Sequence, residues 1–427
     1  MEPQNLRLEG IYQQRQAGYF MQRVKLAAGV ISAVQARCVA DTAERFGRGT
    51  IHLTSRGSME IHWLKGEDLP LVKQEFAKVG LTSRGACGGA VRGVTCSGQD
   101  AVEFPQLESL ARRIHRHFTG NPRYEGLPKK FKIGIEASIS SGRHLIQDVG
   151  LVLAGNVDGG ACYDLWIAGG LGREPRAGFL LVKSLRESMI IPVIEAIIAV
   201  YARLVPPPKR LKTLAADPGE AELRRLIEAE PSYHEQIPER GGFTDNLTQP
   251  AGGRERLLHP VFAGQLTAAA LHELAAFAQK NADSILQVTA DQNVAFPLTA
   301  CVNPDQAAAE LATLADADTG DAQVTFRICP GNHECRMGLA ATRDIAKKVI
   351  AALSPSARKL TWALSGCANS CSQPQLADVG IISSALAGDG GEKTARFDLY
   401  ERPTAGLGEK VRERLTLDEL AALISAY

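Results

Sequence analysis

The sequence lacks an excess of charge of either sign. Its 427 residues include 48 Lys and Arg against 47 Asp and Glu, which leaves a formal net charge of +1. A near-neutral chain has no general electrostatic attraction to nucleic acid or to an anionic membrane surface. We therefore expect neither as the main partner, and any basic binding site must be local.

Long apolar runs and a secretory signal are also missing. The most apolar stretch, Met189 to Val205, is interrupted by a proline and two charged residues. It is shorter than the roughly 20 apolar residues that span a bilayer, so it predicts a buried helix and no membrane span. The first residues show neither the charged nor the apolar region of a secretory signal. We expect a cytoplasmic protein.

Nucleotide-binding motifs are absent as well. No P-loop occurs, and the glycine turn at 169–172 has Pro175 where a third glycine of the G-x-G-x-x-G pattern would stand. We therefore expect no nucleotide site of either of these two kinds in the chain.

What the sequence does contain is nine cysteines, an odd number that fits a reducing compartment better than a disulfide framework. Four of them form two pairs. Five residues separate Cys329 from Cys335, and three separate Cys367 from Cys371. Four thiolates are the ligands of a [4Fe–4S] cluster. Structural zinc sites usually pair their cysteines at two to four intervening residues, so the wider spacing weakens the zinc alternative without excluding it.

The chain also contains an internal repeat. Aligning Gly29 with Gly264 without gaps superimposes apolar positions of two amphipathic segments at a constant offset of 235 residues. Each copy predicts a helix, over 34–46 in the first, followed by strand-like alternation, over 50–63 in the first. Only the first copy has a fixed cation in its polar turn, Arg56. We interpret the pattern as a duplicated α+β module.

The segment between the copies includes a basic stretch. Residues 127–132 predict a strand that places Lys130 and Lys132 on one face. Lysine is common on solvated edge strands, so this pair alone does not indicate a site. After the prolines at 206–208, which cannot continue a helix, we expect a loosely ordered connector up to about Gly241.

The two cysteine pairs are expected at the ends of short strands. Residues 324–328 predict a strand that leads into Cys329, and residues 360–364 predict one that delivers Cys367. A helix is predicted between them, over 338–353.

Together these features resemble the sirohaem-containing sulfite and nitrite reductases, over nearly the whole chain and in family order. The resemblance is carried by the cysteine spacing, the duplicated module and the sequences at 53–56, 128–132, 166–172 and 365–371. It implies an α+β fold with duplicated ferredoxin-like modules and two α/β sirohaem- and [4Fe–4S]-binding domains related by a pseudo-two-fold repeat. The implied domains are 1–84, 85–248, 249–320 and 321–427.

The resemblance also implies two cofactors. Cys329, Cys335, Cys367 and Cys371 would hold a [4Fe–4S] cluster, and Cys371 would also be the axial ligand of the sirohaem iron. Sirohaem carries many carboxylates, so its pocket should be basic. Its other contacts would come from Lys25, His52, Thr54, Arg56, Lys129 and Asn369.

The substrate-side cations of the family fall on Arg23, Arg92, Lys130 and Lys132. The implied reaction is the six-electron reduction of sulfite to sulfide, with nitrite to ammonia as the alternative, and the donor would be ferredoxin or a flavoprotein. Arginine should stay charged and stabilise the anion, whereas a buried lysine can donate a proton.

Two other functions remain open. A precorrin-3B synthase-type hydroxylase shares the cluster cysteines, and a subunit that only carries electrons or sirohaem would need no substrate. Retention of Lys130 together with Lys132 favours the reductase. Cys87 and Cys96 flank Arg92 and are expected to be inert buried thiols, and His333 is expected at the surface.

Overall fold

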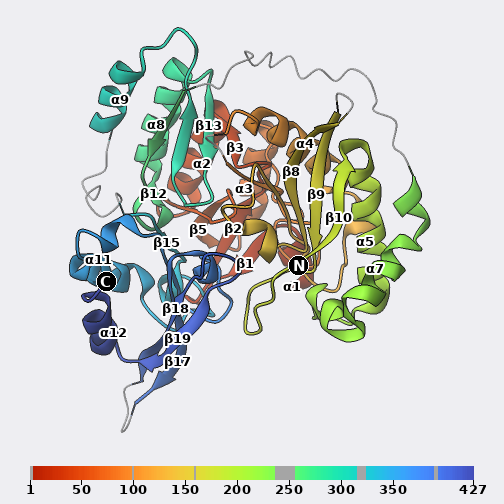
Figure 1. Ribbon diagram of the computed structural model, residues 1–427. Coiled ribbons are helices and arrows are strands. Elements are labelled where there is room, and N and C mark those ends of the chain that lie inside the picture. The colour runs from red at the N-terminus through yellow and green to blue at the C-terminus, as the bar shows by residue number, and fades with distance from the viewer. Residues whose placement is uncertain (1–2, 99–100, 158–159, 236–254, 315–323, 389–392) are drawn as a thin grey trace. The chain divides into compact units, whose positions relative to one another are not determined.

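The computed structural model describes residues 3–98, 101–157, 160–235, 255–314, 324–388 and 393–427 (Figure 1). The chain falls into two compact units. The first comprises 1–10, 84–170 and 175–254, and the second comprises 11–83, 171–174 and 255–427. The finer division into four domains stays a prediction.

The predicted repeat lies in the second unit and matches residue for residue. In the first copy, β3 (Val30–Ser32), α2 (Ala33–Phe46) and β4 (Thr50–Leu53) follow one another. In the second copy, the same elements recur 235 residues later as β12 (Gln265–Thr267), α8 (Ala268–Asn281) and β13 (Ile285–Val288). Ser32 and Thr267 cap the two helices at equivalent positions. The prediction of a duplicated module is confirmed.

The two copies exchange a strand, which the sequence analysis did not predict. One sheet has the order β1-β2-β5-β4-β12, and the other has β11-β14-β13-β3. The additional strands are β1 (Ile11–Gln13), β2 (Tyr19–Val24), β5 (Met59–Lys65), β11 (Arg256–His259) and β14 (Val294–Pro297). Because β12 completes the first sheet and β3 completes the second, neither sheet is built from one copy alone. Helices α2 and α8 pack against each other (Figure 1).

A second pair of sheets shows a second repeat. In the first unit, β6 (Thr95–Ser97), β7 (Ile133–Glu136) and β8 (Val149–Val157) are parallel, and β9 (Gly160–Ile167) and β10 (Phe179–Arg186) continue antiparallel. In the second unit, β15 (Phe326–Ile328), β16 (Trp362–Ser365), β17 (Val379–Ala387), β18 (Thr394–Glu401) and β19 (Glu409–Leu415) have the same order and directions. This topology confirms that the α/β sheet is repeated in the chain.

An aspartate occupies the equivalent position in each of the two sheets and binds the start of the neighbouring strand. A carboxylate oxygen of Asp148 accepts the N–H of Lys132 at 2.8 Å, just before β7. A carboxylate oxygen of Asp378 accepts the N–H of Thr361 at 2.8 Å, just before β16. Each aspartate directly precedes the next parallel strand. Its carboxylate accepts a backbone N–H group that the hydrogen bonds between the strands leave without a partner.

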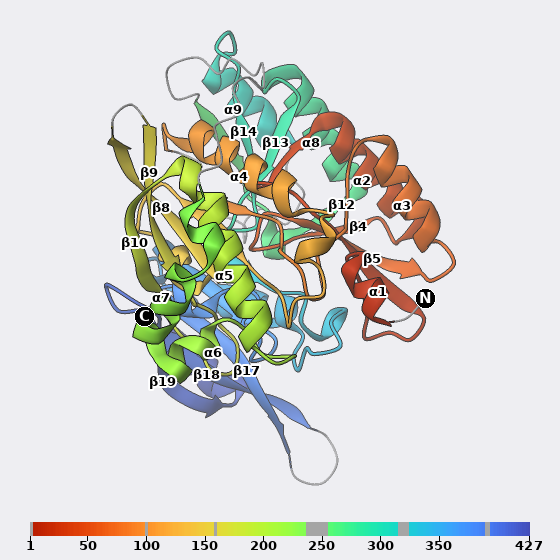
Figure 2. The same ribbon diagram turned by 90° about the vertical axis from the view of Figure 1, so that its right-hand side faces the viewer.

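Helices cover these sheets and enclose the cores. The first unit contains α4 (Phe104–Phe118), α5 (Ile190–Leu204) and α7 (Glu220–Glu228), of which α5 and α7 lie next to each other (Figures 1 and 2). In the second unit, α11 (Thr342–Ala352) and α12 (Leu417–Ile424) share a core with the buried rings of Trp362 and Phe397. The predicted helix after Met189 is confirmed as α5.

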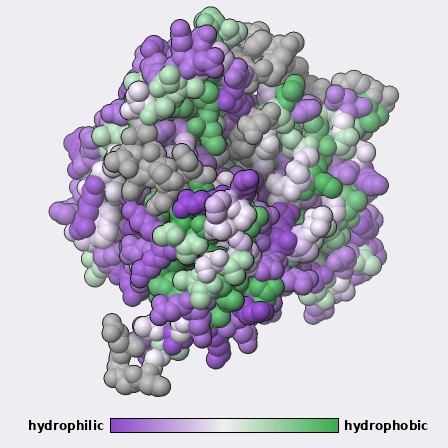
Figure 3. Space-filling view, turned by 60° about the vertical axis from the view of Figure 1, so that its left-hand side comes forward, coloured by the Kyte–Doolittle hydropathy of each residue, from purple (hydrophilic) through white to green (hydrophobic). Residues whose placement is uncertain are grey.

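Among the described residues, no helix is both long and apolar enough to cross a bilayer. On the face shown in Figure 3, hydrophilic and hydrophobic residues are interspersed.

Four predicted elements differ from the structure. The expected loose connector is mostly helical between residues 212 and 234, where Leu223 and Ile227 are fully buried one turn apart on α7; Gly241 lies outside the described residues. The expected strand over 50–63 is two strands, β4 and β5, joined by a turn at 54–58. The expected basic strand makes only one bridge, between Phe131 and Val91, before β7 begins.

The helix predicted over 338–353 begins later, at Thr342. The N–H of Leu339 is bound by the carbonyl of Gly366 at 2.7 Å, and the N–H of Gly338 by that of Cys335 at 3.0 Å. These bonds hold the segment as part of the cysteine loops, so it cannot start the helix.

Candidate functional site

The structure brings the four paired cysteines to one edge of a sheet. Cys329 follows β15 directly, and Cys367 follows β16 after one residue. Because β15 and β16 are parallel neighbours, their carboxyl ends lie at the same edge. Cys335 and Cys371 lie further along the same two loops. The thiols of Cys329 and Cys335 each interact electrostatically with those of Cys367 and Cys371.

The two cysteine loops are packed together too closely for side chains at their glycines. Gly331 has a φ of 60°, and a Cβ there would stand 2.5 Å from the carbonyl oxygen of Ala340. A Cβ on Gly338 would stand 2.2 Å from the carbonyl carbon of Gly331. Glycine is therefore required at both positions, and the loops hold the thiols at fixed places.

Backbone N–H groups point at the sulfur atoms. Gly366 donates to Sγ of Cys329 at 3.1 Å. Gly331 and Met337 give further backbone bonds, to Cys329 and Cys335 respectively. Burial raises the pKa of Cys329 far above its usual value and that of Cys335 to about 11. Such thiols ionise only beside a strong positive charge, as a metal supplies, and the N–H donors then stabilise the bound sulfur. The donor set fits an iron–sulfur cluster.

The turns of both modules support the second cysteine loop. The hydroxyl of Ser55 donates to the carbonyl of Cys371 at 2.7 Å. In the second module, Asp291 binds Arg327 at 2.9 Å, and the same guanidinium donates to the carbonyl of Ser372 at 3.0 Å. These residues were not predicted from the sequence. The repeat was the signal for Ser55 and Asp291, because they lie in equivalent polar turns; Arg327 lies on β15 and has no such signal.

A buried polar row crosses the first module's sheet. Arg23 on β2 and His52 on β4 lie directly opposite Glu60 on β5. Nε of Arg23 donates to Oε1 of Glu60 at 2.9 Å, and Nε2 of His62 lies 3.3 Å from Oε2. Burial alone would raise the pKa of Glu60, but Arg23 and His62 hold it well below its ordinary value. The predicted cation Arg23 therefore faces a buried carboxylate that the sequence analysis missed.

The other residues predicted for the second unit occupy different environments. His52 is buried, which lowers its pKa to about 3, so it offers hydrogen bonds and no charge. Lys25 is also buried, Arg56 is half-buried and Asn369 is exposed. The hydroxyl of Thr54 accepts the N–H groups of Arg56 at 3.3 Å and Ser58 at 3.1 Å, which shapes the turn.

The remaining predicted cations lie together in the first unit. Arg92 is buried, and its guanidinium donates to the carbonyls of Gly85 at 3.2 Å and Gly88 at 2.8 Å. The N–H of Arg92 binds the carbonyl of Phe131 at 2.8 Å, so the backbone of Arg92 lies beside the segment that carries the half-buried Lys130 and Lys132. Lys129 is exposed.

Two smaller expectations have different outcomes. Cys87 and Cys96 are buried as expected, and burial raises the pKa of Cys96 well above its usual value. His333 was expected at the surface but is half-buried, which lowers its pKa.

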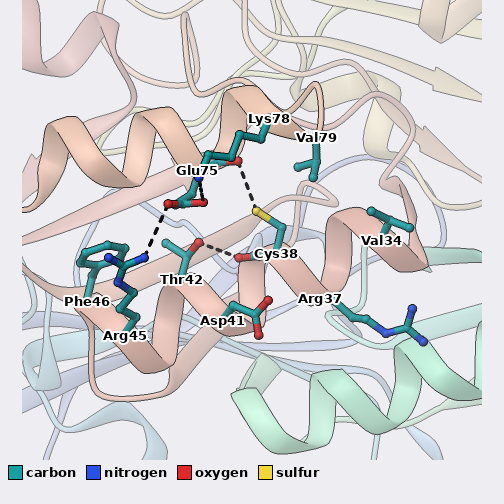
Figure 4. A pocket seen from close by; sticks show the side chains of 10 residues that line it. All are labelled: Val34, Arg37, Cys38, Asp41, Thr42, Arg45, Phe46, Glu75, Lys78 and Val79. Carbon is teal, nitrogen blue, oxygen red and sulfur yellow. Dashed lines mark hydrogen bonds and ion pairs between the residues drawn. The ribbon is translucent and has the colours of Figure 1, made fainter.

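A cavity of about 470 Å³ lies elsewhere, between α2 and α3 (Leu69–Lys78) (Figure 4). Its polar groups bind one another: Sγ of Cys38 donates to the carbonyl of Glu75 at 3.4 Å, and Glu75 binds Lys78 at 2.7 Å. None of the residues predicted for the site lines this cavity, so we do not assign the site to it.

Two family models match the chain. The ferredoxin-like half domain of nitrite and sulfite reductases matches residues 12–79, and the nitrite and sulphite reductase 4Fe-4S domain matches residues 85–235. The chain belongs to the nitrite and sulfite reductase family. It is an oxidoreductase, and membership supports an iron–sulfur cofactor.

Relatives from this family are similar over most of their length. The chain is 27% identical to an assimilatory ferredoxin-dependent nitrite reductase of Haloferax mediterranei, over 98% of this chain and 81% of that protein. It is 25% identical to a sulfite reductase [ferredoxin] of Mycobacterium tuberculosis, over 96% of this chain and 79% of that protein. The solved structure of the M. tuberculosis NirA protein has a TM-score of 0.83 at 24% identity, covers 100% of this chain and 87% of that one, and confirms the fold.

The match to the family's 4Fe-4S domain does not include the paired cysteines. Residues 85–235 contain only Cys87, Cys96 and Cys162, all buried. Three cysteines cannot supply the four thiolates of a cubane cluster. The four paired cysteines all lie in the second unit, in the loops after β15 and β16 of the sheet that repeats the topology of the first.

Proposed function

We propose that this family member is a sirohaem- and [4Fe–4S]-dependent reductase that reduces sulfite to sulfide, with nitrite to ammonia as the alternative reaction of the same site. The observation that carries the proposal is the set of four thiols at the ends of β15 and β16 in a chain of this family. A six-electron reduction of one bound anion needs an electron store beside the reaction site, and such a cluster provides one.

Cys329, Cys335, Cys367 and Cys371 would hold the cluster. Cys371 would also bind the sirohaem iron, so that one sulfur joins the two cofactors. Its loop is suited to this role, because Cys371 is exposed while Ser55 fixes its carbonyl. Sirohaem, when bound, would supply the redox-active iron needed to reduce the anion.

Contacts to the sirohaem carboxylates would come from the cations Lys25, Arg56 and Lys129. The neutral groups Thr54, His52 and Asn369 would add hydrogen bonds. Charge-assisted bonds to carboxylates are roughly twice as strong as neutral ones, so the three cations should contribute most of the affinity.

The substrate would be held by the four predicted cations. Arg23 and Arg92 remain charged and stabilise the oxyanion, and the bonds from Arg92 to two carbonyls fix the direction of its guanidinium. Lys130 and Lys132 would deliver protons, because every oxygen of sulfite or nitrite must leave as water. Ferredoxin would supply the electrons, as the names of the relatives indicate for those proteins; a flavoprotein is the alternative donor.

Anaerobic turnover of the purified holoprotein tests the proposal. With reduced methyl viologen as the chemical donor, we expect sulfite to yield sulfide and nitrite to yield ammonia, with the higher kcat/KM for sulfite. Oxygen-dependent hydroxylation of a tetrapyrrole, without reduction of either anion, would favour the precorrin-3B synthase-type activity. If the holoprotein turns over none of these substrates, the remaining function is that of a subunit that only carries electrons or sirohaem.

A further inference from the structure

The buried polar row of the first module contains two ionisable residues to which the proposed function gives no role. Glu60 is 5% exposed and His62 is 6% exposed. Both lie on β5, two residues apart, so they share one face of the sheet. Burying a carboxylate is costly unless it is paired and hydrogen-bonded, so the partners of Glu60 matter.

The contacts of Glu60 suggest the task. Its Oε1 binds Arg23 through Nε at 2.9 Å and also contacts Nη2. Its Oε2 is bound by Nε2 of His62 at 3.3 Å. Both carboxylate oxygens are thus engaged, one by the predicted substrate cation and one by a buried imidazole. The cross-strand pairing of Arg23 with Glu60 adds a backbone constraint to the same contact.

We propose that Glu60 is a positioning residue that holds the guanidinium of Arg23 in place for the anionic substrate, and that His62 fixes the Glu60 carboxylate. The inference rests on the proposed function, since it takes Arg23 as a substrate ligand. It assigns no direct substrate contact to Glu60 or His62.

The physical reason is preorganisation. An arginine side chain has many rotamers and loses substantial conformational entropy when it is ordered. Glu60 orders Arg23 before the substrate arrives, so that this cost is not subtracted from binding. Glu60 also compensates the charge of Arg23, which lets the guanidinium remain partly buried, at 28% side-chain exposure. Misplacing a positioned group by about 1 Å can reduce turnover by roughly 100-fold.

A double-mutant cycle tests this role. Glu60→Gln keeps the shape but removes the charge that holds Arg23, and we expect kcat/KM for the anion to fall by about 10- to 100-fold. Glu60→Asp keeps the charge, so its kcat/KM should fall less than that of Glu60→Gln. In an Arg23→Ala background, Glu60→Gln should have no further effect, because its action passes through Arg23.

Glu108→Gln is the matched control. Glu108 is also a buried carboxylate, paired to Arg112 at 2.7 Å on α4 in the first unit, and its replacement should leave kcat/KM unchanged. Iron content and the visible spectrum show whether each variant retains its cofactors. If Glu60→Gln loses them, His62→Gln takes its place in the cycle with Arg23→Ala.

The outcomes separate the two proposals. If the wild type reduces neither sulfite nor nitrite, the proposed function fails, and this inference fails with it. If the wild type is active and the Glu60 and Arg23 losses multiply, Glu60 acts independently of Arg23 and only the inference is overturned. An unchanged kcat/KM in Glu60→Gln also overturns it.

Discussion

At the scale of single residues, burial distinguishes side chains that the sequence presents as equals. Lys129, Lys130 and Lys132 form one basic run, yet Lys129 is exposed and the other two are half-buried. The N–H of Lys132 is bound by Asp148, so the position of its backbone is fixed. The basic run was predictable from the sequence, but its environments were not, because they depend on segments distant in the chain.

Lys132→Ala should lower turnover of sulfite by roughly 100-fold or more, since positioned acids contribute about 10²- to 10⁴-fold. The visible spectrum should stay unchanged, because Lys132 is proposed to act on the substrate. Lys183→Ala, at an exposed position of β10, is the control. Equal rates in the two variants would return Lys132 to the role of a solvated surface residue.

Cys371→Ser should lose the thiolate proposed to join cluster and haem. We expect loss of the haem absorption together with iron and acid-labile sulfide. Cys87→Ser, at a buried thiol outside the two cysteine loops, should retain both cofactors. Equal cofactor loss in the two variants would refute the assignment of Cys371.

At the scale of elements, the side chain of Gln292 links two strands that belong to different sheets. Gln292, in the second module's turn, donates to the carbonyls of Leu53 at 2.7 Å and Ile328 at 2.9 Å, and accepts the N–H of Ile328. It therefore connects β4 of the first module to β15, the strand that leads into Cys329. The sequence showed the polar turn, but a single glutamine carries no sign of such a long-range contact.

Gln292→Leu should destabilise the fold by a few kcal/mol, since each buried group left unsatisfied costs about 1–3 kcal/mol. Urea unfolding measures the change. Gln279→Leu is the control, because Gln279 makes a single exposed side-chain bond, to Arg37. A midpoint for Gln292→Leu equal to that of the control would contradict the connecting role.

Ser55→Ala should loosen the second cysteine loop without unfolding the sheet. A hydrogen bond of this kind contributes about 1 kcal/mol, so we expect earlier loss of iron on heating and little change in global stability. Ser425→Ala removes an exposed bond at the C-terminal end of α12 and should leave iron retention unchanged. If both variants retain iron as the wild type does, Ser55 does not stabilise the second cysteine loop.

At the scale of the whole molecule, the repeats were predictable where they recur in sequence. The 235-residue offset reproduces α2 and α8 residue for residue. The exchange of β3 and β12 was not predictable, because three-residue strands carry too little pattern to specify a distant partner. Glu60 was not predicted either, because its burial depends on packing between segments that are distant in the sequence. Alternation on β5 places it on a face that looks solvated in the sequence, but the structure buries both faces.

The family explains why these two repeats occur in one chain. Its models match the first ferredoxin-like half and the first α/β half, and the second copies complete the scheme. The second copies carry the thiols, and the first copies carry the predicted substrate cations. We therefore propose that one chain holds both a cluster and a sirohaem.

The visible absorption spectrum of the purified full chain, measured with its iron and acid-labile sulfide content, tests that claim most directly. The account predicts haem absorption and more iron than sulfide, because the sirohaem iron adds to the iron of the cluster. Equal iron and sulfide without haem bands, or bound zinc in place of both, would contradict it.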